Sequence, residues 1–435
     1  MTSIAVVVLD SVRKDVFDEF FGWLGGRHFD NAWSTSHYTV PVHGSLFTGR
    51  YPSETGVHAK NEHFDYPGFA LAELLSEHGY DVHGISENLL LSPINDFDRG
   101  FDTFHMIGSA AQTRPNVYNW LYAIDEIPGE GSVRDALTIL DCLRSDVDTR
   151  RSLEVGYRVK FGRFDGVSEA RTRYRDIDTT GNTFLFLNLM EAHGPYNPPS
   201  SYQTVDCDQY GVDEGDSPLT PTTDFDDQRS CYRDCVRYLA DAYSKFFRSL
   251  RRDFEYVITL SDHGELFGNH GGYQHWRGLY PELTHIPLVI TGEGVDYGHS
   301  DQLASVVDVH RTILSLAGID GDGRGQDILA PDEQSPRLTE SHGLRPSRIR
   351  ALEDREIPRE EYASIDDPMQ GIIVPPADYG YETPDGFETP DGVEPKSLRE
   401  YLRNQTRELD HREAAPDDGS VDSEVRRHLE QLGYA

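Results

Sequence analysis

Lysine and positive charge are scarce in this chain of 435 residues. The 40 Lys and Arg residues stand against 75 Asp and Glu residues, for a formal net charge of −35, and only five of the basic residues are lysines. A protein that binds a nucleic-acid backbone needs a basic face to displace counterions, so this composition effectively excludes nucleic acid as a partner. An acid-rich, lysine-poor surface stays soluble where concentrated salt screens its self-repulsion, so we expect a salt-loving source organism.

Cysteine and long apolar runs are scarce too. The chain has four cysteines, without CxxC spacing and too few for a disulfide framework: Cys142, Cys207, Cys231 and Cys235. We expect ordinary thiols, with a bridge between Cys231 and Cys235, or one that involves Cys207, as the alternative. No apolar stretch approaches the roughly 18 residues that span a membrane, and the run at residues 3–9 is too short for a signal peptide. The expected location is the cytoplasm.

Four short apolar runs predict buried strands. They are continuous and rich in β-branched or aromatic residues, and they lie at residues 3–9, 183–189, 256–260 and 287–290. Helical patterns between them cover Ala70 to His78 and Tyr232 to Leu250. This alternation predicts an α/β sandwich with a central, mostly parallel sheet flanked by helices.

The regions outside this pattern are more polar. Residues 105–180 indicate helical excursions over the sheet, and residues 201–230 indicate an acidic loop. The composition shifts after about residue 335, so we expect a main domain over residues 1–335 and a C-terminal extension over residues 336–435. In the extension the pentapeptide ETPDG occurs twice, which indicates a linker-like stretch with little to bury, so that deletion from about residue 380 onward should leave the fold intact. Residues 423–432 have amphipathic helical spacing and are expected to dock back on the body.

Polar residues that directly follow the apolar runs are the first candidates for a site, because open α/β sheets bind ligands beyond the carboxyl ends of their strands. Asp10 follows the first run, and Asp262 and His263 follow the third. Two carboxylates and an imidazole can hold one divalent cation. Asp10 alone is equally typical of a cap or turn, whereas an Asp-His pair that leaves a five-residue strand is hard to explain structurally.

Two further segments carry candidates. In HYTVPVHGSLFTGRYP, Pro41 predicts the first turn of a helix, which places the Thr39 hydroxyl near free backbone N–H groups and the positive end of the helix dipole. Such a position favours an ionised alkoxide, and the alternative is an ordinary N-cap threonine. His193 lies in a Gly- and Pro-rich loop after the second run. It is either a functional residue of the site or a loop histidine that hydrogen-bonds the backbone.

The order of these motifs resembles the sulfatase family, within the alkaline-phosphatase-like superfamily. The matching motifs, over roughly residues 3–320, are a strand followed by Asp, TxPxHxSLFTGxYP, MEAHGPYNPP, SDHGExxGxHGxYxH and LYPELTHIPLVI. The resemblance implies that residues 1–335 form the catalytic domain. It also implies one divalent cation (Ca²⁺, Mn²⁺, Mg²⁺ or Zn²⁺) with four ligands. These are the nucleophile, Thr39, and the side chains of Asp10, Asp262 and His263.

The chain departs from the family pattern at several positions. The family carries Cys or Ser, converted to formylglycine, in C/S-x-P-x-R, whereas this chain has Thr39, with His43 in place of the arginine. Thr39 resembles instead the direct nucleophile of phosphodiesterase and phosphoglycerol transferase members. Ser11 replaces a second metal-binding Asp, and Leu189 replaces the Asp that two-metal members need. One metal is therefore favoured, with a partial second site at His270 and His275 as the alternative.

The basic residues with which the family binds its substrates are also missing from this chain. The stretch that should hold its Lys-x-His pair offers only Ser86, Glu87 and Asn88, and the usual lysine before YEE is absent. We expect Thr39 to attack, His193 or His275 to protonate the leaving alcohol, and His43 and Arg277 to neutralise charge on the equatorial oxygens. The expected substrate contacts are Asn88, Arg277 and His270.

These expectations describe a metal-dependent hydrolase of sulfate or phosphate esters, on small molecules or glycans. One rival is a phosphodiesterase or phosphoglycerol-type transferase, which Thr39 favours. The other is a catalytically degenerate protein that binds an anionic glycan. The missing Arg, Lys and Asp favour that rival, whereas the retention of Asp10, Thr39, His193, Asp262 and His263 together argues against it.

Overall fold

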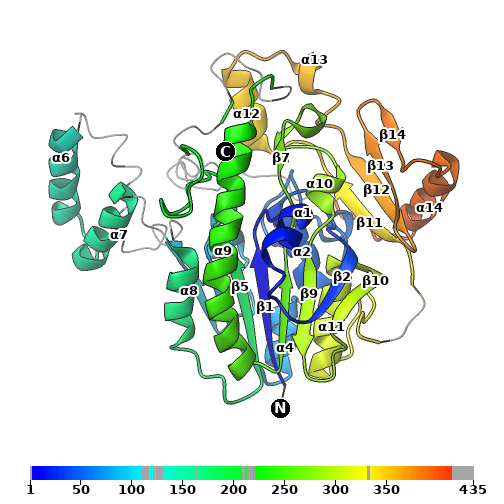
Figure 1. The fold of residues 1–435 in the computed structure, drawn as a ribbon, viewed down its shortest axis with the longest axis horizontal. Coiled ribbons are helices and arrows are strands. Elements are labelled where there is room, and N and C mark those ends of the chain that lie inside the picture. Colours follow the sequence, from blue (N-terminus) through cyan, green and yellow to red (C-terminus); the bar gives the residue numbers. More distant parts are fainter. Residues whose placement is uncertain are drawn as a thin grey trace.

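The computed structural model describes residues 2–108, 117, 118, 120, 123, 131–161, 165–207, 211, 212, 219, 221–330 and 334–413. Its centre is an eight-stranded sheet in the order β10-β2-β9-β6-β1-β5-β3-β4 (Figure 1). The strands are β10 (Gly298–Ser305), β2 (Arg27–Trp33), β9 (Leu288–Gly292), β6 (Tyr256–Leu260), β1 (Ser3–Leu9), β5 (Thr183–Leu189), β3 (Asp81–Ser86) and β4 (Thr103–Met106). Neighbouring strands run parallel except where β9 pairs with β2 and with β6. The expected mostly parallel sheet is confirmed.

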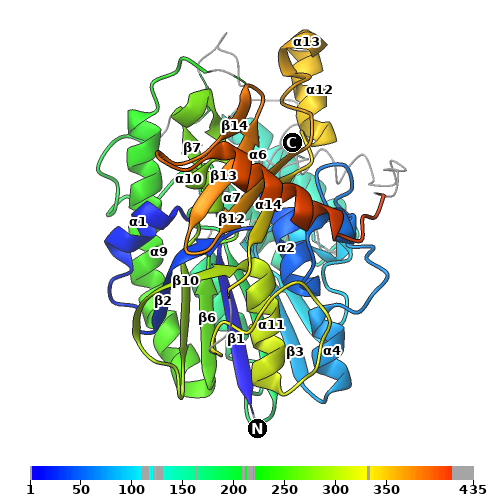
Figure 2. The ribbon, with the colours of Figure 1, turned by 90° about the vertical axis from the view of Figure 1, so that its right-hand side faces the viewer.

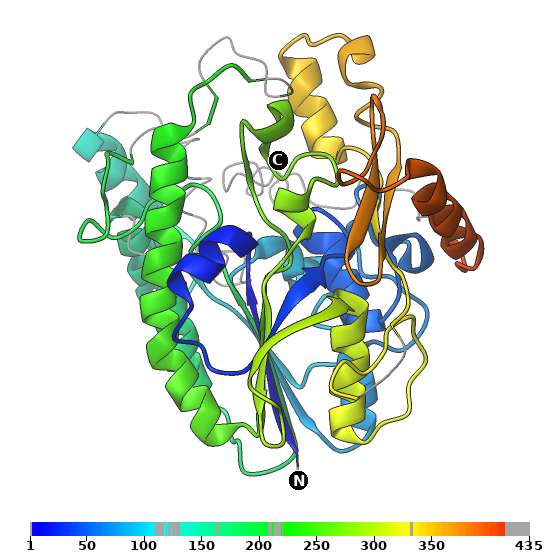
Figure 3. The ribbon, with the colours of Figure 1, turned by 45° about the vertical axis from the view of Figure 1, so that its right-hand side comes forward.

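Two helical layers cover this sheet. Alternate side chains of β1 face opposite layers: Ile4, Val6 and Val8 belong to one apolar core, and Ala5 and Val7 to the other. The first layer contains α2 (Thr39–Thr48), α4 (Leu71–Glu77) and α11 (Val306–Ala317), and the second contains α1 (Lys14–Phe20), α8 (Gly166–Tyr174) and α9 (Asp226–Asp253). Figure 3 shows the long green α9 and the yellow α11 on opposite sides of the sheet. Burial on both faces explains why the sequences of β1, β5 and β6 are nearly continuously apolar.

The other α-helices do not belong to these two layers. They are α3 (Pro52–Thr55), α6 (Gly131–Arg144), α7 (Thr149–Phe161), α10 (Pro281–Thr284), α12 (Pro346–Asp354), α13 (Arg359–Tyr362) and α14 (Pro395–Arg407). The helices α6 and α7 project from one side of the molecule (Figure 1), in the region expected to form helical excursions. None of the helices in the described ranges combines the length and the apolar character needed to cross a membrane.

The cysteines differ from the expectation of ordinary thiols. Cys207 and Cys231 form a disulfide, which agrees with the alternative of a bridge that involves Cys207, whereas Cys142 and Cys235 are free and buried. The bridge joins the loop after β5 to the first turns of α9, across a sequence separation of 24 residues. That proximity arises from the packing of the loop on the helix, and a Cys pair at this spacing carries no sequence signature.

The C-terminal region corrects a second expectation. Residues 337–388 form an antiparallel sheet of β11 (Arg337–Ser341), β12 (Met369–Val374), β13 (Asp378–Thr383) and β14 (Gly386–Glu388), and α14 packs on it (Figure 2). The first ETPDG copy supplies the end of β13, the hairpin turn and the start of β14, so the linker-like interpretation is wrong. Tyr379 and Tyr381, two residues apart on β13, are buried against the main body. A spacing of two residues places both side chains on the same face of a strand. This pattern indicates a strand in spite of the many turn residues around it.

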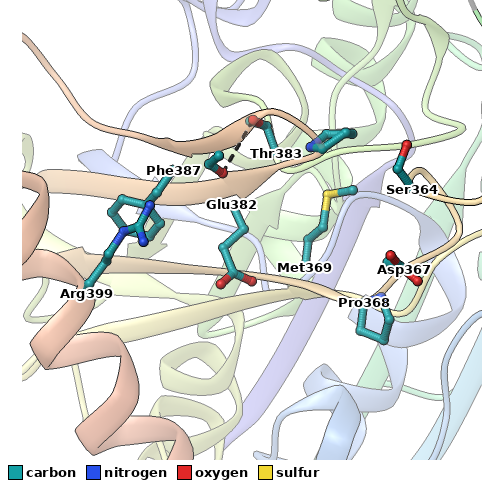
Figure 4. A pocket seen from close by; sticks show the side chains of 10 residues that line it. Ser364, Asp367, Pro368, Met369, Glu382, Thr383, Phe387 and Arg399 are labelled. Atoms are coloured by element: carbon teal, nitrogen blue, oxygen red, sulfur yellow. Dashed lines mark hydrogen bonds between the residues drawn. The ribbon is translucent and has the colours of Figure 1, made fainter.

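The same hairpin lines a hollow of about 340 Å³ (Figure 4). Glu382 and Thr383 contribute from β13, Phe387 from β14 and Arg399 from α14. The Arg399 guanidinium lies 4.9 Å from the centre of the Phe387 ring, which ties helix to hairpin. Residues 423–432, expected to form a helix, lie outside the described residues, and the boundary at residue 335 stays a prediction.

Candidate active site

The carboxyl ends of four central strands meet at one edge of the sheet, and polar residues follow each of them. Asp10 follows β1, Asn88 follows β3, and Asp262 and His263 follow β6. His193 comes shortly after β5. The strand order β6-β1-β5-β3 makes these ends neighbours, as in the ligand-binding edge of other open α/β sheets.

Thr39 reaches this edge from the first turn of α2. Tyr38 is the N-cap residue of that helix, so the alternative of an N-cap threonine is wrong. Thr39 is 2% exposed, and its Oγ1 lies 3.3 Å from Nε2 of His263 and 3.4 Å from Nδ2 of Asn88. The unpaired N–H groups of the first turn make the surroundings of this hydroxyl positive, which favours a developing alkoxide.

Asp10 is a buried carboxylate held by hydrogen bonds. Its Oδ2 accepts from Nδ2 of Asn88 at 2.8 Å and from Nδ2 of Asn188 at 3.2 Å, and its Oδ1 accepts from the Ser11 hydroxyl at 2.9 Å. Burial raises the pKa of Asp10, but the nearby imidazoles of His193 and His263 and the two amides outweigh burial and lower this pKa to about 2. Asp10 is therefore ionised at neutral pH.

Asp262 is the second buried carboxylate. Its Oδ1 accepts from the backbone N–H groups of Ser11, at 3.2 Å, and of His263, at 2.9 Å. Its Oδ2 is buried without a hydrogen-bond partner. Burial, and then the negative charge of Asp10, raise the pKa of Asp262 well above its ordinary value. Both carboxylates can be ionised together only if a positive group lies between them.

A divalent cation fits these donors. One oxygen each of Asp10 and Asp262 and one nitrogen of His263 lie within 4.8 Å of one another, and no other such group of three occurs among the described residues. A cation would satisfy the unpartnered Oδ2 of Asp262 and offset the repulsion between the carboxylates. Mixed oxygen and nitrogen donors suit several divalent metals and do not select one.

Backbone carbonyl groups determine which ring nitrogen carries the proton in two neutral histidines. Nδ1 of His263 lies 2.9 Å from the Gly264 oxygen, and Nδ1 of His43 lies 2.9 Å from the Thr39 oxygen. Because a carbonyl only accepts, both Nδ1 atoms carry a proton, and in the neutral rings both Nε2 atoms present a lone pair. Nε2 of His263 thus faces the Thr39 hydroxyl as an acceptor or metal ligand. Burial lowers the pKa of His43 to about 4, so this residue is neutral at pH 7.

Glu265 is a site residue that the sequence reasoning missed, although it stands in the SDHGE motif. Its Oε1 lies 3.0 Å from Nδ1 of His275, and its Oε2 accepts from the Tyr196 hydroxyl at 2.8 Å. Burial raises the pKa of Glu265 to about 7. The His275 ring lies 4.4 Å from the His263 ring and 5.4 Å from the His193 ring. A carboxyl group on Nδ1 orients an imidazole for proton transfer at Nε2, as in acid–base pairs of hydrolases.

Two expected substrate contacts lie elsewhere. His270 is exposed and pairs with Glu282, Nε2 to Oε2, at 3.0 Å. Nη2 of Arg277 donates to the backbone oxygen of Gly271 at 3.2 Å. None of the contacts that the structure gives these two side chains reaches Thr39 or the metal donors. The loop that carries them returns on itself through Gly268 and Gly271, which the motif spacing alone does not show.

Ser11 and Asn188 are further site residues that were not expected to support the metal donors, although Ser11 stands where the family has a second metal-binding Asp. Ser11 has a φ of 61°, a left-handed conformation that is unusual for serine, and this turn aims its N–H at Asp262 and its hydroxyl at Asp10. Asn188 is buried in β5, in a run that otherwise reads as apolar core. Both residues support metal donors and do not stand in a motif of their own.

Comparison with known proteins places this geometry in context. The model of the family described as Sulfatase matches residues 24–319. An uncharacterized sulfatase of Escherichia coli (strain K12), YidJ, is 22% identical over 344 residues, which are 71% of this chain and 64% of that protein. Lipoteichoic acid synthase 2 of Bacillus subtilis (strain 168) is 30% identical over 141 residues, 29% of this chain and 22% of that protein. The chain thus spans less than two thirds of these relatives.

The fold has close counterparts among solved structures. The phosphonate monoester hydrolase SpPMH from Silicibacter pomeroyi superimposes with a TM-score of 0.62 at 14% identity, over 94% of this chain and 96% of that one. At this identity the similarity establishes the fold alone, which is the alkaline-phosphatase-like α/β sandwich expected from the sequence.

Proposed function

This chain belongs to the sulfatase family, and on that premise we propose that it cleaves sulfate or phosphate esters with Thr39 as the nucleophile. The observation that carries the proposal is the position of the Thr39 hydroxyl. It lies in the first turn of α2, 3.3 Å from Nε2 of His263, which is itself one of the three clustered metal donors. A threonine with only a structural role in a helix has no need of these neighbours.

The residues divide the chemistry between them. Asp10, Asp262 and His263, with Thr39, would hold a divalent cation, which when bound polarises the ester oxygen and lowers the pKa of the Thr39 hydroxyl. Thr39 would release its hydroxyl proton to solvent, Oγ1 would attack sulfur or phosphorus in line, and the bond from that atom to the alcohol oxygen would break. The amide of Asn88, 2.8 Å from Asp10 and 3.4 Å from Thr39, holds the nucleophile beside the metal donors.

The leaving alcohol needs a proton, and His275 and His193 are the candidates. Glu265 holds Nδ1 of His275 at 3.0 Å and so orients the ring, and Nε2 is the atom that would donate once this ring has taken up a proton. His193 lies beside it, with its own Nδ1 2.8 Å from the Gly194 oxygen. The oxygen of water or of an acceptor alcohol would then attack the sulfur or phosphorus of the Thr39 ester, the bond to Oγ1 would break, and the proton of the attacking hydroxyl would replace the one that Thr39 lost.

His43 has a different part from the one expected. Its buried, neutral imidazole donates to the Thr39 carbonyl and packs on the ring of Phe186. These contacts support a positioning role in the first turn of α2, because a neutral ring does not offset the charge of an ester.

A phosphodiester cleavage or phosphoglycerol-type transfer is the second candidate function. Thr39 in place of a formylglycine precursor favours it, and so does the local match to a lipoteichoic acid synthase. The degenerate glycan-binding alternative is weaker, because the nucleophile, the three metal donors and a carboxyl-supported histidine all occur together.

A panel of four chromogenic esters tests the proposal. We would assay 4-nitrophenyl sulfate, 4-nitrophenyl phosphate, bis(4-nitrophenyl) phosphate and 4-nitrophenyl phenylphosphonate, at high salt, before and after chelation and with each divalent metal restored. We expect cleavage that chelation abolishes and a metal restores, and the preferred ester decides between the two functions. An absence of cleavage with every ester and metal would leave only the binding protein.

A further inference from the structure

We propose that Tyr232, on the long helix α9, is a positioning residue of the metal site and acts on it through the turn at Ser11. The hydroxyl of Tyr232 bonds the backbone of this turn, and the turn bonds the carboxylates of Asp10 and Asp262. The inference rests on the proposed function, because it concerns how the chain holds these two carboxylates as metal donors.

The turn between β1 and α1 supports both carboxylate donors. The N–H of Ser11 donates to Oδ1 of Asp262 at 3.2 Å, and the Ser11 hydroxyl donates to Oδ1 of Asp10 at 2.9 Å. Both bonds are made from the left-handed conformation of Ser11, whose φ is 61°. This conformation is costly for a serine, and it persists only where the surrounding structure determines it. The turn therefore needs a support of its own.

The hydroxyl of Tyr232 supplies this support by bridging the two ends of the turn. It donates to the carbonyl oxygen of Ser11 at 2.9 Å and accepts from the N–H of Arg13 at 2.8 Å. Burial raises the pKa of the Tyr232 hydroxyl above its ordinary value, so the proton that the first bond requires is present at neutral pH. One buried hydroxyl thus satisfies two backbone groups on either side of Val12 and stabilises the turn in this form.

The position of Tyr232 is itself well determined. Its side chain is fully buried, and its ring centre lies 5.5 Å from that of Tyr196 and 5.1 Å from that of Phe267. The preceding residue, Cys231, is joined to Cys207 by the disulfide. Ring packing and a covalent bond at the neighbouring residue therefore give the hydroxyl a defined place, as the support of a metal donor requires.

The orientation of Asp262 depends on this turn. Its Oδ1 accepts from the backbone N–H groups of Ser11 and His263, which leaves Oδ2 buried and unpartnered as the oxygen for a cation. A displaced turn would remove one of these two donors and let the carboxylate rotate. Loss of the Tyr232 hydroxyl should therefore weaken metal binding, although this hydroxyl bonds the turn and not the carboxylates.

Calorimetric titration of Mn²⁺ into the metal-free protein at high salt tests this role without turnover. We expect Tyr232→Phe to bind Mn²⁺ roughly tenfold more weakly than the native protein, as is typical when a residue that supports metal ligands is changed. This variant keeps the ring and its packing, so it should fold. Tyr243→Phe is the matched control, because Tyr243 is also buried on α9 but its hydroxyl bonds Oγ1 of Thr259, at 2.7 Å. It should keep the native Kd.

Thermal melts of the same proteins separate positioning from a general loss of stability. Both variants lose one buried hydroxyl and should melt at lower temperatures than the native protein, but only Tyr232→Phe should lose affinity for Mn²⁺. A native Kd in Tyr232→Phe would overturn the role, and so would an equal loss of affinity in Tyr243→Phe. If the native protein binds no Mn²⁺, the metal site of the proposed function is refuted, and the role of Tyr232 with it.

A double-mutant cycle tests whether Tyr232 acts through Ser11. Ser11→Ala removes the hydroxyl that bonds Asp10 and keeps the N–H that bonds Asp262. We expect Tyr232→Phe to weaken Mn²⁺ binding by a smaller factor in Ser11→Ala than in the native protein, because part of what the turn supports is already lost. Equal factors in the two backgrounds would contradict the connection through Ser11.

Discussion

Nε2 of His263 lies 3.3 Å from Oγ1 of Thr39 and 3.5 Å from Oδ2 of Asp262. One imidazole thus connects the expected nucleophile to the unpartnered oxygen of a buried carboxylate. Because Nδ1 of His263 donates to the Gly264 oxygen, Nε2 of the neutral ring presents a lone pair that accepts a hydrogen bond or binds a metal. This geometry underlies the metal and nucleophile predictions below.

Removal of a metal donor should remove the metal. The native protein is expected to hold about one divalent ion per chain, and Asp262→Asn should hold far less, because it loses one of three clustered donors. Asp301→Asn, at an exposed carboxylate, is the matched control and should keep the native content. Elemental analysis after gel filtration measures all three, and equal metal in Asp262→Asn would disprove the site.

Deletion of residues 380–435 should destabilise the protein, in contrast to the expectation from composition. It removes most of the β13–β14 hairpin and α14, whose Leu398 and Leu402 are buried with Leu338 of β11. Burial of one leucine contributes roughly 1.5–3 kcal/mol, so the free energy of unfolding should fall by about 3 kcal/mol or more.

A chain that ends at residue 413 is the control for this deletion. It keeps the bond from the Arg412 N–H to the Ser53 oxygen and the ion pair between Arg412 and Asp65. Thermal melts of the two shortened chains and the full chain should separate them. Identical melting temperatures would show that the C-terminal sheet contributes no stability.

Glu87 should make stability depend on pH. Burial, and then the charge of Glu191, raise the pKa of Glu87 well above its ordinary value. As pH rises past the ordinary value, the unfolded chain loses this proton while the folded chain keeps it, so the free energy of unfolding falls with pH. Glu87→Gln imitates the protonated form and should raise the melting temperature at about pH 8 but not at about pH 5.

Glu77→Gln, at the exposed end of α4, controls for the loss of one acidic charge from a very acidic protein. It should change the melting temperature little at either pH. An equal gain for Glu87→Gln at both pH values would show that its carboxyl group does not titrate abnormally.

The disulfide is open to a direct test. Peptide mapping without reductant should recover Cys207 joined to Cys231. A cross-link over a loop of this size stabilises by about 3 kcal/mol in the chain-entropy account, so reductant should lower the melting temperature of the native protein but not of Cys207→Ser. A bridge that persists in cells would favour an oxidising compartment over the expected cytoplasm. Recovery of free Cys207 from native protein would contradict the pairing.

The four strands at the centre of the sheet could be predicted because they are short, continuously apolar and buried, whereas β2, β3, β4 and β10 lacked this pattern. The runs at 3–9, 183–189 and 256–260 coincide with β1, β5 and β6, and the fourth run begins one residue before β9. Asp10, Asp262 and His263 follow from those strands, since a polar residue after a buried strand must lie at the binding edge.

Other parts depend on contacts that local sequence does not encode. Packing between segments of the chain produces the left-handed turn at Ser11 and the pairing of Glu265 with His275. The composition of the ETPDG hairpin led to a wrong prediction, because most of its residues are turn formers. Only two residues, Tyr379 and Tyr381, anchor it on the main body.

The rate of ester cleavage by Thr39→Ala, measured beside Thr39→Ser and the native protein, tests the nucleophile most directly. If the Thr39 hydroxyl attacks, Thr39→Ala should lose at least about a thousandfold in kcat, and Thr39→Ser should keep a measurable part of the activity, because only the hydroxyl is required. The peptide of residues 28–50 should carry an unmodified threonine in the active protein. Undiminished turnover in Thr39→Ala would contradict the assignment of the nucleophile.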